Sequence, residues 1–174
     1  MADETAGTVD PALFRRVMSS FATGVTVVTT ERDGEVRGMT ANAFMSGSLT
    51  PPLCIVSVAT RARTHALLME TGAFGVSILG QGQEKLSIHF SGRPFPDLEP
   101  VFERLGGVPV LPGSAGAIAA EIVARHDCGD HSLFVGGITH MRAGITAPLL
   151  VHSGRYAALL YSDEELAAPT FDFW

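Results

Sequence analysis

Apolar residues at helical spacing near the N-terminus predict one amphipathic helix. Asp10 is a typical N-cap, and Pro11 suits the first helical turn, where a missing N–H costs nothing. Apolar positions then recur every three or four residues until Gly24 ends the pattern: Leu13, Phe14, Val17, Met18 and Phe21. Residues 1–9 before this helix are small and acidic, so we expect them to form a flexible tail.

Short runs of β-branched and apolar residues predict that antiparallel strands dominate the rest of the chain. Residues 25–30 and 35–40 read as a hairpin, because Asp33-Gly34 favours a tight turn between them. Two long strands, 117–126 and 132–140, flank a polar turn over 127–130. The other expected strands are 44–49, 53–59, 73–79, 149–152 and 156–160.

The segments between these strands predict two short helices and one irregular excursion. Thr64 is placed to cap a helix over 65–70 that Gly72 closes, and a second helix is expected over 83–90. Prolines and aromatic residues make 92–107 irregular, with a helical turn near 101–104. The spacing of the strands favours a closed or partly closed antiparallel barrel, and 174 residues fit one domain over 1–174.

Composition and charge narrow the possible partners. The net charge is −6, and no dense basic stripe is present to neutralise a phosphate backbone, so nucleic acid is an unsuitable partner. Charged residues make up 17% of the chain, below the roughly 25% of an average soluble domain. A surface with so few charged residues indicates that part of it is covered by another subunit, most simply in a two-fold homodimer.

Cysteine usage and the N-terminal segment point to the cytoplasm. Cys54 and Cys128 are the only cysteines, and we expect free thiols because a chain of this length needs no disulfide. The acidic start lacks the basic and apolar regions of a secretion signal. No uncharged apolar run reaches the roughly 18 residues that span a bilayer, so we expect no membrane insertion.

Several familiar site motifs are absent or incomplete. Residues 80–85 lack the third glycine of a dinucleotide-binding turn, and neither a phosphate-binding Gly-Lys-Ser/Thr loop nor a nucleophile elbow occurs. Residues 126–131 carry His, Cys and Asp, but no second ligand group has matching spacing, so a polar hairpin end is favoured over a metal site. The four isolated histidines are read as structural: His65, His89, His140 and His152.

One stretch, 38–53, has the composition of a wall for a flat ligand. Its small residues allow close approach to the backbone, while Thr40, Asn42, Ser46 and Ser48 offer hydrogen bonds along one edge. Downstream, Arg61, Arg63 and Thr64 stand at an expected helix start, where free N–H groups and guanidinium groups attract phosphate. From the residues alone, an ordinary strand–turn–strand followed by a capped helix remains the alternative.

Four motifs occur in order along the chain. They are Phe21-Ala22-Thr23-Gly24-Val25-Thr26-Val27-Val28-Thr29; Gly38-Met39-Thr40-Ala41-Asn42 with Ser46-x-Ser48-Leu49-x-Pro51-Pro52-Leu53; Gly129-Asp130-His131-x-Leu133-Phe134-Val135-Gly136; and Pro148-Leu149-Leu150-x-His152-x-Gly154-x-Tyr156. Together they resemble the flavin reductase-like family, the small NAD(P)H:flavin oxidoreductases that serve two-component monooxygenases. The resemblance runs from about Phe14 to Leu160. This chain departs from the family pattern at Ala22, at Val151 and over 93–97. Because of the last departure, the residues that contact the flavin tail and the nicotinamide stay undecided.

This resemblance implies an FMN-binding split β-barrel of antiparallel Greek-key type, homodimeric, that uses FMN or FAD with NADH or NADPH. Arg63 and Thr64 would hold the flavin phosphate, and Phe90 and Arg93 would close over the flavin. His131 belongs to the nicotinamide side, where Tyr156 would complete the wall. The residues that would contact or border the ring and ribityl chain are Thr40, Ala41, Asn42, Ser46, Ser48, Ser57, Val58 and Ala59.

The implied activity is hydride transfer from nicotinamide to flavin, which needs two stacked rings and hydrogen-bond donors rather than an acid–base triad. We expect a diffusible or loosely held flavin whose reduced form supplies an oxygenase partner. Two alternatives stay open. One is a flavoprotein of the same fold that keeps its flavin and reduces a ferric chelate, nitro or azo compound, and the other is a non-catalytic flavin-binding barrel.

Overall fold

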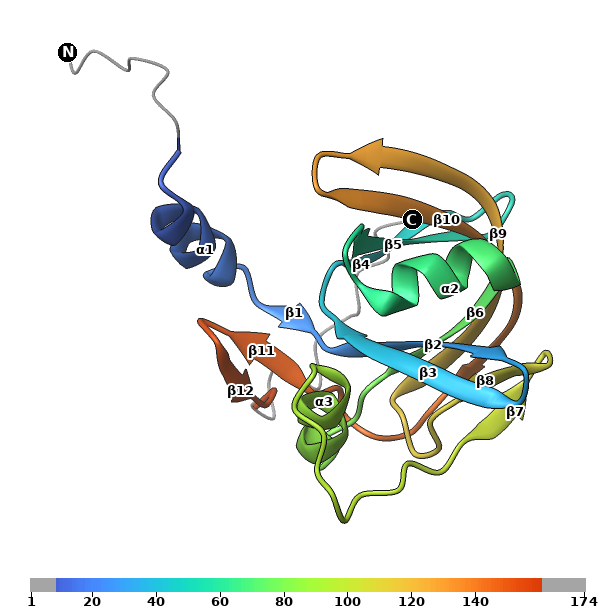
Figure 1. Cartoon of the computed structure of the whole chain (residues 1–174). Helices are drawn as coiled ribbons and strands as arrows, with labels where there is room; N and C mark the ends of the chain where they lie inside the picture. The colour runs from blue at the N-terminus through green and yellow to red at the C-terminus, as the bar shows by residue number, and fades with distance from the viewer. Residues whose placement is uncertain (1–8, 161–174) are drawn as a thin grey trace.

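A computed structural model describes residues 9–160, and most of the expected N-terminal tail and the aromatic end 171–174 lie outside that range. Three helices and twelve strands follow one another in the described part of the chain (Figure 1). The helices are α1 (Pro11–Ser19), α2 (Arg63–Thr71) and α3 (Glu84–Phe90). The strands are β1 (Thr23–Gly24), β2 (Thr26–Arg32), β3 (Glu35–Ala41), β4 (Phe44–Ser48), β5 (Leu53–Ala59), β6 (Ala73–Ile78), β7 (Glu103–Leu105), β8 (Val108–Val110), β9 (Gly116–Cys128), β10 (His131–Ala143), β11 (Leu150–His152) and β12 (Arg155–Ala157).

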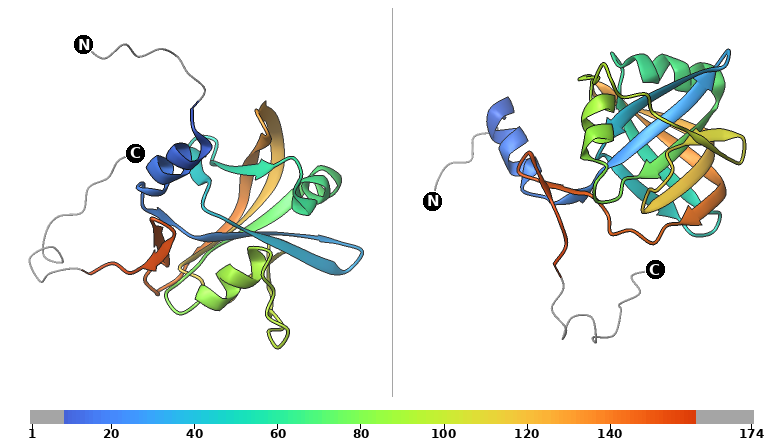
Figure 2. Two further views of the ribbon diagram at one scale, coloured as in Figure 1. Left: turned by 60° about the vertical axis from the view of Figure 1, so that its left-hand side comes forward. Right: turned by 90° about the horizontal axis from the view of Figure 1, so that it is seen from below.

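The main sheet is antiparallel and closes on itself. Its seven strands follow the order β3-β2-β6-β9-β10-β5-β4, so β3 and β4 are its two edges. Only residues 42 and 43 join these edges, and three Cα–Cα steps span at most about 11 Å. The end of β3 and the start of β4 therefore lie close together, and the sheet curls into a barrel-like shape (Figure 2). The sequence prediction of a mainly β, antiparallel fold is confirmed.

Two apolar clusters hold the barrel together. The first fills its interior with fully buried Phe74, Phe134 and Leu68, the last of these contributed by α2. The second lies on the other side of β2, where Val27 packs with Leu149 and with the partly buried Phe90 of α3. Residues 26–30 of β2 are buried on both faces, which fits a strand covered by α2 on one side and α3 on the other.

Helix α2 is held in a fixed position against the barrel. It ends at Gly72, which adopts a left-handed conformation with φ of 67° that glycine reaches without strain. Near that end, Thr71 Oγ1 lies 2.7 Å from Thr30 Oγ1 of β2. These contacts and buried Leu68 fix the position of Arg63, at the opposite end of the helix, relative to β2 and β3.

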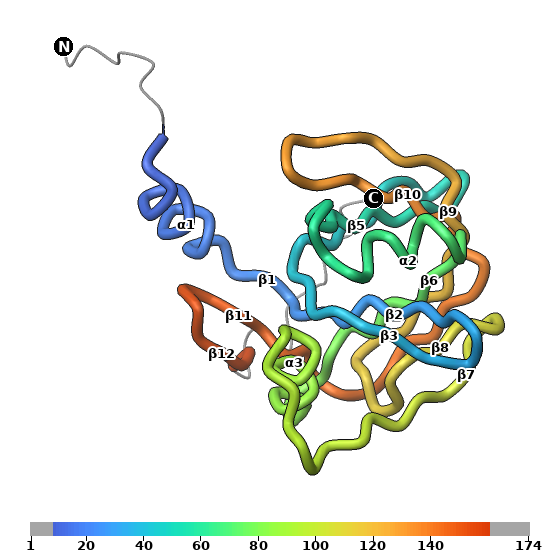
Figure 3. The backbone as a smooth tube through the Cα atoms, in the orientation of Figure 1, coloured from blue at the N-terminus to red at the C-terminus, as the bar shows by residue number. Residues whose placement is uncertain are grey.

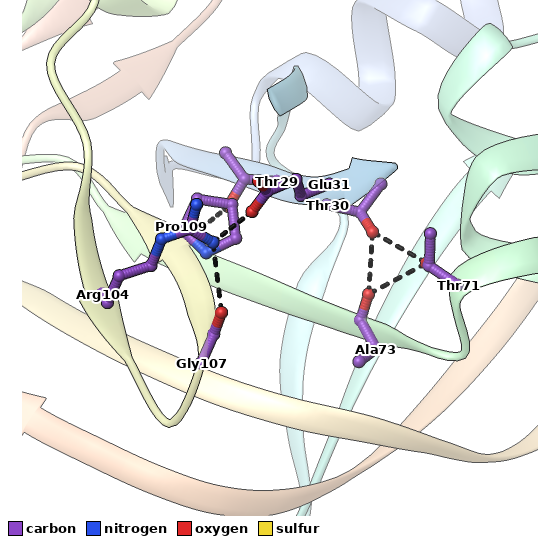
Figure 4. A network of polar contacts seen from close by, with 8 residues as sticks. All are labelled: Thr29, Thr30, Glu31, Thr71, Ala73, Arg104, Gly107 and Pro109. Atoms are coloured by element: carbon purple, nitrogen blue, oxygen red, sulfur yellow. Dashed lines mark hydrogen bonds and ion pairs between the residues drawn. The ribbon is translucent and has the colours of Figure 1, made fainter. Parts of the chain in front are cut away.

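The β7–β8 hairpin is fastened to β2 by polar contacts (Figure 4). Thr29 donates its hydroxyl to the carbonyl of Pro109, and Arg104 forms an ion pair with Glu31. The hydrogen bond from Arg104 lowers the pKa of the Glu31 carboxyl. These contacts correct the expected helical turn near 101–104: Glu103–Leu105 instead forms β7, because pairing with β8 satisfies its backbone.

Other differences from the sequence prediction lie at the ends of elements. Helix α1 ends at Ser19 and not near Gly24, because the chain turns there to pair β1 with β11. Thr64 is not the cap of α2: Ala62 occupies that position without a side-chain bond, and Thr64 lies buried in the first turn. The last strand covers Arg155–Ala157 and does not continue to residue 160.

Helix α1 and the β11–β12 hairpin project from one side of the barrel (Figures 2 and 3). No residue of α1 is buried, although its sequence is amphipathic as predicted. The exposed apolar residues on and just after this helix are Leu13, Phe14, Val17, Met18 and Phe21.

Candidate functional site

Two surface hollows lie along β3. The first, which we call the α3 hollow, has a volume of about 480 Å³ and lies among β3, α3 and the β11–β12 hairpin. Its polar lining residues are Thr40, Asn42, Ser87, Ser91, Arg93 and Tyr156. The second, the α2 hollow, has a volume of about 490 Å³ and lies between β3 and α2. Its polar lining residues are Arg32, Glu35, Arg37, Arg63, Thr64 and Glu70.

Ser87 joins the three walls of the α3 hollow. The hydroxyl of Thr40 on β3 donates to the carbonyl of Ser87 at 2.6 Å. The phenol of Tyr156 on β12 donates to the Ser87 hydroxyl at 2.9 Å. Ser87 itself is almost fully buried on α3. Ser87 could not be picked out from the sequence, because a serine inside an expected helix carries no motif.

The α3 hollow brings together four predicted site residues: Thr40, Asn42, Arg93 and Tyr156. Asn42 and Arg93 are exposed, so their donors are accessible to a ligand. Phe90, which is predicted to close over the flavin, does not line the α3 hollow. It packs close to Gly38, where a Cβ would lie 2.9 Å from its Cδ1, and it belongs to the second apolar cluster.

Arg63 and Thr64, which are predicted to hold a phosphate, both line the α2 hollow at the start of that helix. Thr64 is buried and Arg63 is exposed. The first turn of α2 contains no acidic residue, so its free N–H groups keep their attraction for a negative charge. Guanidinium and N–H donors together suit a phosphate.

Other predicted residues lie on β3, β4, β5 and β10, outside the lining of either hollow. Ser57 and Ala59 are half-buried on β5, where Ala59 is opposite His131 of β10. Ser46 is exposed and Ser48 half-buried on the edge strand β4. The side chains of Val58 and Ala41 are both part of the interior cluster, so only their main chains remain to border a ligand.

His131 stands at the tip of the β9–β10 hairpin and is paired with its neighbour. Its Nδ1 lies 2.7 Å from Oδ1 of Asp130, and this contact lowers the pKa of the Asp130 carboxyl. The imidazole is partly exposed. His131 therefore has an accessible ring whose orientation is set by Asp130, although it does not line the α3 hollow.

The donor set of the α3 hollow fits a planar heterocycle. Hydroxyl, amide and guanidinium groups stand around it, while Val25 and Val151 supply apolar contact for a ring. Its volume lies within the roughly 300–1,000 Å³ of small-molecule sites. Within residues 9–160, no cluster of three or more His, Cys, Asp or Glu side chains could hold a metal ion.

Comparison with known proteins gives the family. A family model described as flavin reductase like domain matches residues 18–160. The chain belongs to this family. An NADH-dependent flavin reductase of a Rhodococcus species is 42% identical over 163 residues, which cover 90% of this chain and 93% of the relative. The reductase component of 4-hydroxyphenylacetate 3-monooxygenase from Thermus thermophilus is 40% identical, with 82% and 91% covered.

Solved structures of flavin reductases share the same architecture. The flavin reductase PheA2 in its native state matches with a TM-score of 0.86 and 42% identity, over 88% of this chain and 100% of that one. The NADH:FAD oxidoreductase of Streptomyces globisporus C-1027, in complex with NAD and FAD fragments, matches with a TM-score of 0.80 and 35% identity. That match covers 91% of this chain and 99% of the other.

None of the helices in the described range is long and apolar enough to traverse a bilayer.

Proposed function

We propose that this flavin reductase transfers hydride from NADH to FMN or FAD and supplies the reduced flavin to a separate oxygenase. The observation that carries the proposal is the α3 hollow, a polar and open depression beside Thr40 and Asn42 in a chain of this family. The name of the Thermus relative, a monooxygenase reductase component, supports an oxygenase partner. The names of the other relatives support NADH and flavin as substrates.

In this proposal the protein's residues bind the flavin and orient the nicotinamide. A bound flavin supplies a ring that accepts hydride at N5. Thr40 and Asn42 border that ring, and Arg63 with Thr64 holds the phosphate at the start of α2. His131, held by Asp130, orients the nicotinamide. Ser46, Ser48, Ser57 and Ala59 contribute donors and small surfaces on the adjoining strands.

The openness of the site supports a diffusible flavin. Asn42 and Arg93 are exposed, so the hydrogen-bond donors that they offer a ligand are also accessible to water. A ligand held this way exchanges a protein hydrogen bond for one to water, which changes the free energy by only about 1 kcal/mol per bond. We therefore propose that flavin is a substrate that leaves after reduction.

Steady-state oxidation of NADH and NADPH, each with FMN, FAD and riboflavin, tests the function. We expect turnover with NADH to rise and saturate as free flavin is added. Full activity without added flavin would instead indicate a flavoprotein that keeps its flavin and reduces another acceptor. If the purified protein neither binds flavin nor oxidises either nicotinamide when flavin is present, the proposed activity is wrong.

We also propose a cytoplasmic homodimer that covers the apolar face of α1. Phe14, Val17 and Met18 are each more than half exposed on this nine-residue helix. Isolated helices of that length are marginal in water, so α1 needs a covering surface to be stable. A second copy of the chain provides it, which agrees with the low charged fraction of 17%.

Light scattering coupled to size-exclusion chromatography tests the dimer. The wild-type protein is expected to elute with twice the mass of one chain at micromolar concentration. Phe14→Asp with Val17→Asp should shift it toward a monomer, whereas Arg15→Asp on the same helix serves as the charge control. A monomeric wild type would refute the dimer and leave the reductase assay unaffected.

A further inference from the structure

His65 on α2 contacts the hairpin that carries His131. Its Nε2 lies 2.9 Å from the hydroxyl oxygen of Ser132 on β10. Its ring also packs edge-on against Phe134 of the same strand, with 5.2 Å between the ring centroids. Figure 1 shows the hairpin of β9 and β10 passing beside α2. The sequence predicts only a structural role for His65, and the proposed function does not explain why it joins α2 to this hairpin.

Ser132 is the buried partner in this contact. It is 1% exposed, and its hydroxyl donates to Oδ1 of Asp127 at 3.4 Å. Because the hydroxyl has a single hydrogen, Nε2 of His65 carries the hydrogen of the other bond and donates it to Ser132. Neither His65 nor Ser132 lines the α3 hollow or the α2 hollow. The pair is therefore suited to positioning other groups and not to touching a substrate.

Thr60, just before α2, contacts the same hairpin at its tip. Its backbone N–H donates to the carbonyl of Asp130 at 3.0 Å, and its hydroxyl donates to the same oxygen at 3.1 Å. Asp130 in turn holds the imidazole of His131. Residues 60–65 thus contact the hairpin on both sides of His131, at Asp130 before it and at Ser132 after it.

The geometry of β10 transmits this restraint to His131. Neighbouring side chains of a strand point to opposite faces, so Ser132 faces the buried side while His131 faces the other. A hydrogen bond that fixes Ser132 therefore fixes the backbone from which the His131 ring projects. Residues 60–65 also include Arg63 and Thr64. The same short segment thus connects the expected phosphate site to the tip of the hairpin.

We propose that His65 and Ser132 are positioning residues for hydride transfer. Their hydrogen bond fixes the tip of the β9–β10 hairpin, and so it holds His131 at a set distance from the phosphate site at Arg63. This inference rests on the proposed function for the roles of His131 and Arg63. Hydride transfer needs two rings in a defined geometry, so a small displacement of the group that orients the nicotinamide lowers the rate.

Variants that remove or keep the hydrogen bond test the inference. Ser132→Ala and His65→Phe both remove it, and Ser132→Ala does so with little change in volume. His65→Gln keeps an N–H donor that can reach Ser132. Thr139→Val is the control, because it removes a hydroxyl bond of the same strand, to the carbonyl of Ala119 at 3.2 Å, far from the tip.

Two measurements on each variant separate positioning from a merely structural role. Stopped-flow experiments give the rate of FMN reduction at saturating NADH, and hydrogen exchange followed by mass spectrometry gives the protection of residues 127–133. Ser132→Ala and His65→Phe should lower the rate and the protection about fivefold, the equivalent of one neutral hydrogen bond. The FMN dissociation constant should stay nearly unchanged, because Leu68 and Thr71 still hold α2. His65→Gln and Thr139→Val should keep the wild-type values.

Wild-type reduction rates in Ser132→Ala and His65→Phe would overturn the inference, even if both variants have a lower Tm. A rate in His65→Gln as low as in His65→Phe would also overturn it, and so would an equal loss in Thr139→Val. A wild type that oxidises no NADH would refute the proposed function by itself. The exchange comparison would then decide the inference: loss of protection at the tip would uphold the restraint, and unchanged protection would overturn it.

Discussion

The hydrogen bond between Tyr156 and Ser87 offers a sharp test of how the α3 hollow is built. Tyr156→Phe removes the phenol that donates to the Ser87 hydroxyl at 2.9 Å and keeps the aromatic ring. Ser87→Ala removes the acceptor from the opposite side. If this bond ties the β11–β12 hairpin to α3, the two variants should act on the same interaction.

The structure sets the size of the effect. A neutral hydrogen bond contributes about 0.5–1.5 kcal/mol to stability. In Tyr156→Phe the buried Ser87 hydroxyl also loses a hydrogen-bond partner. In Ser87→Ala the partly exposed phenol can donate its hydrogen bond to water instead. Alanine is in addition the better helix former, by a few tenths of a kcal/mol. We therefore expect Tyr156→Phe to cost about 1 kcal/mol and Ser87→Ala less.

Urea denaturation of the wild type, both single variants and the double variant measures the coupling. The expected coupling energy is about 1 kcal/mol, and Tyr156→Phe should lower Tm by about 2–4 °C. Both single variants should raise the KM for NADH together, because each releases the same wall of the hollow. Strict additivity of the two single changes would refute the reasoning, since it would mean that the bond contributes nothing.

Three further predictions follow from single side chains. Arg63→Ala should weaken FMN about tenfold and riboflavin little, as titration would show; equal losses would place the phosphate elsewhere. His131→Ala should slow flavin reduction by NADH in stopped-flow experiments while leaving the flavin dissociation constant nearly unchanged, and an unaltered rate would remove His131 from the site. Iodoacetamide should label Cys128 in the folded protein but not Cys54, whose burial raises its thiol pKa to about 11. Two labels per folded chain would contradict that burial.

The sequence predicted the strands because their pattern is local. The hairpin at Asp33-Gly34 and the two long strands before and after Gly129 follow from turn chemistry and alternation that neighbouring residues determine. The order of the seven strands in the main sheet cannot be predicted from such local patterns. It depends on pairings between distant segments, such as β2 with β6, that no local pattern encodes. Strand β7 was missed because its pairing and the Arg104–Glu31 contact outweigh local helical preference.

The site was predicted only in part, for the same reason. The family motifs located Thr40, Asn42 and Tyr156, which the fold brings to one hollow although Tyr156 is far from the other two in sequence. Ser87 carries no motif, and its importance comes from a tertiary contact with Thr40. Arg37 lies within the predicted strand 35–40, and no local pattern shows that it comes close to α2 in the folded chain.

Gly38 connects these observations physically. A Cβ at this position would lie 2.9 Å from Cδ1 and 3.0 Å from Cε1 of Phe90, so only glycine lets α3 approach β3 this closely. That close approach brings the carbonyl of Ser87 within 2.6 Å of the Thr40 hydroxyl and so forms one wall of the α3 hollow. The backbone of Gly38 also lines the α2 hollow. The glycine in the Gly38-Met39-Thr40 motif thus acts through packing, by setting the distance between β3 and α3, and the α3 hollow depends on that distance.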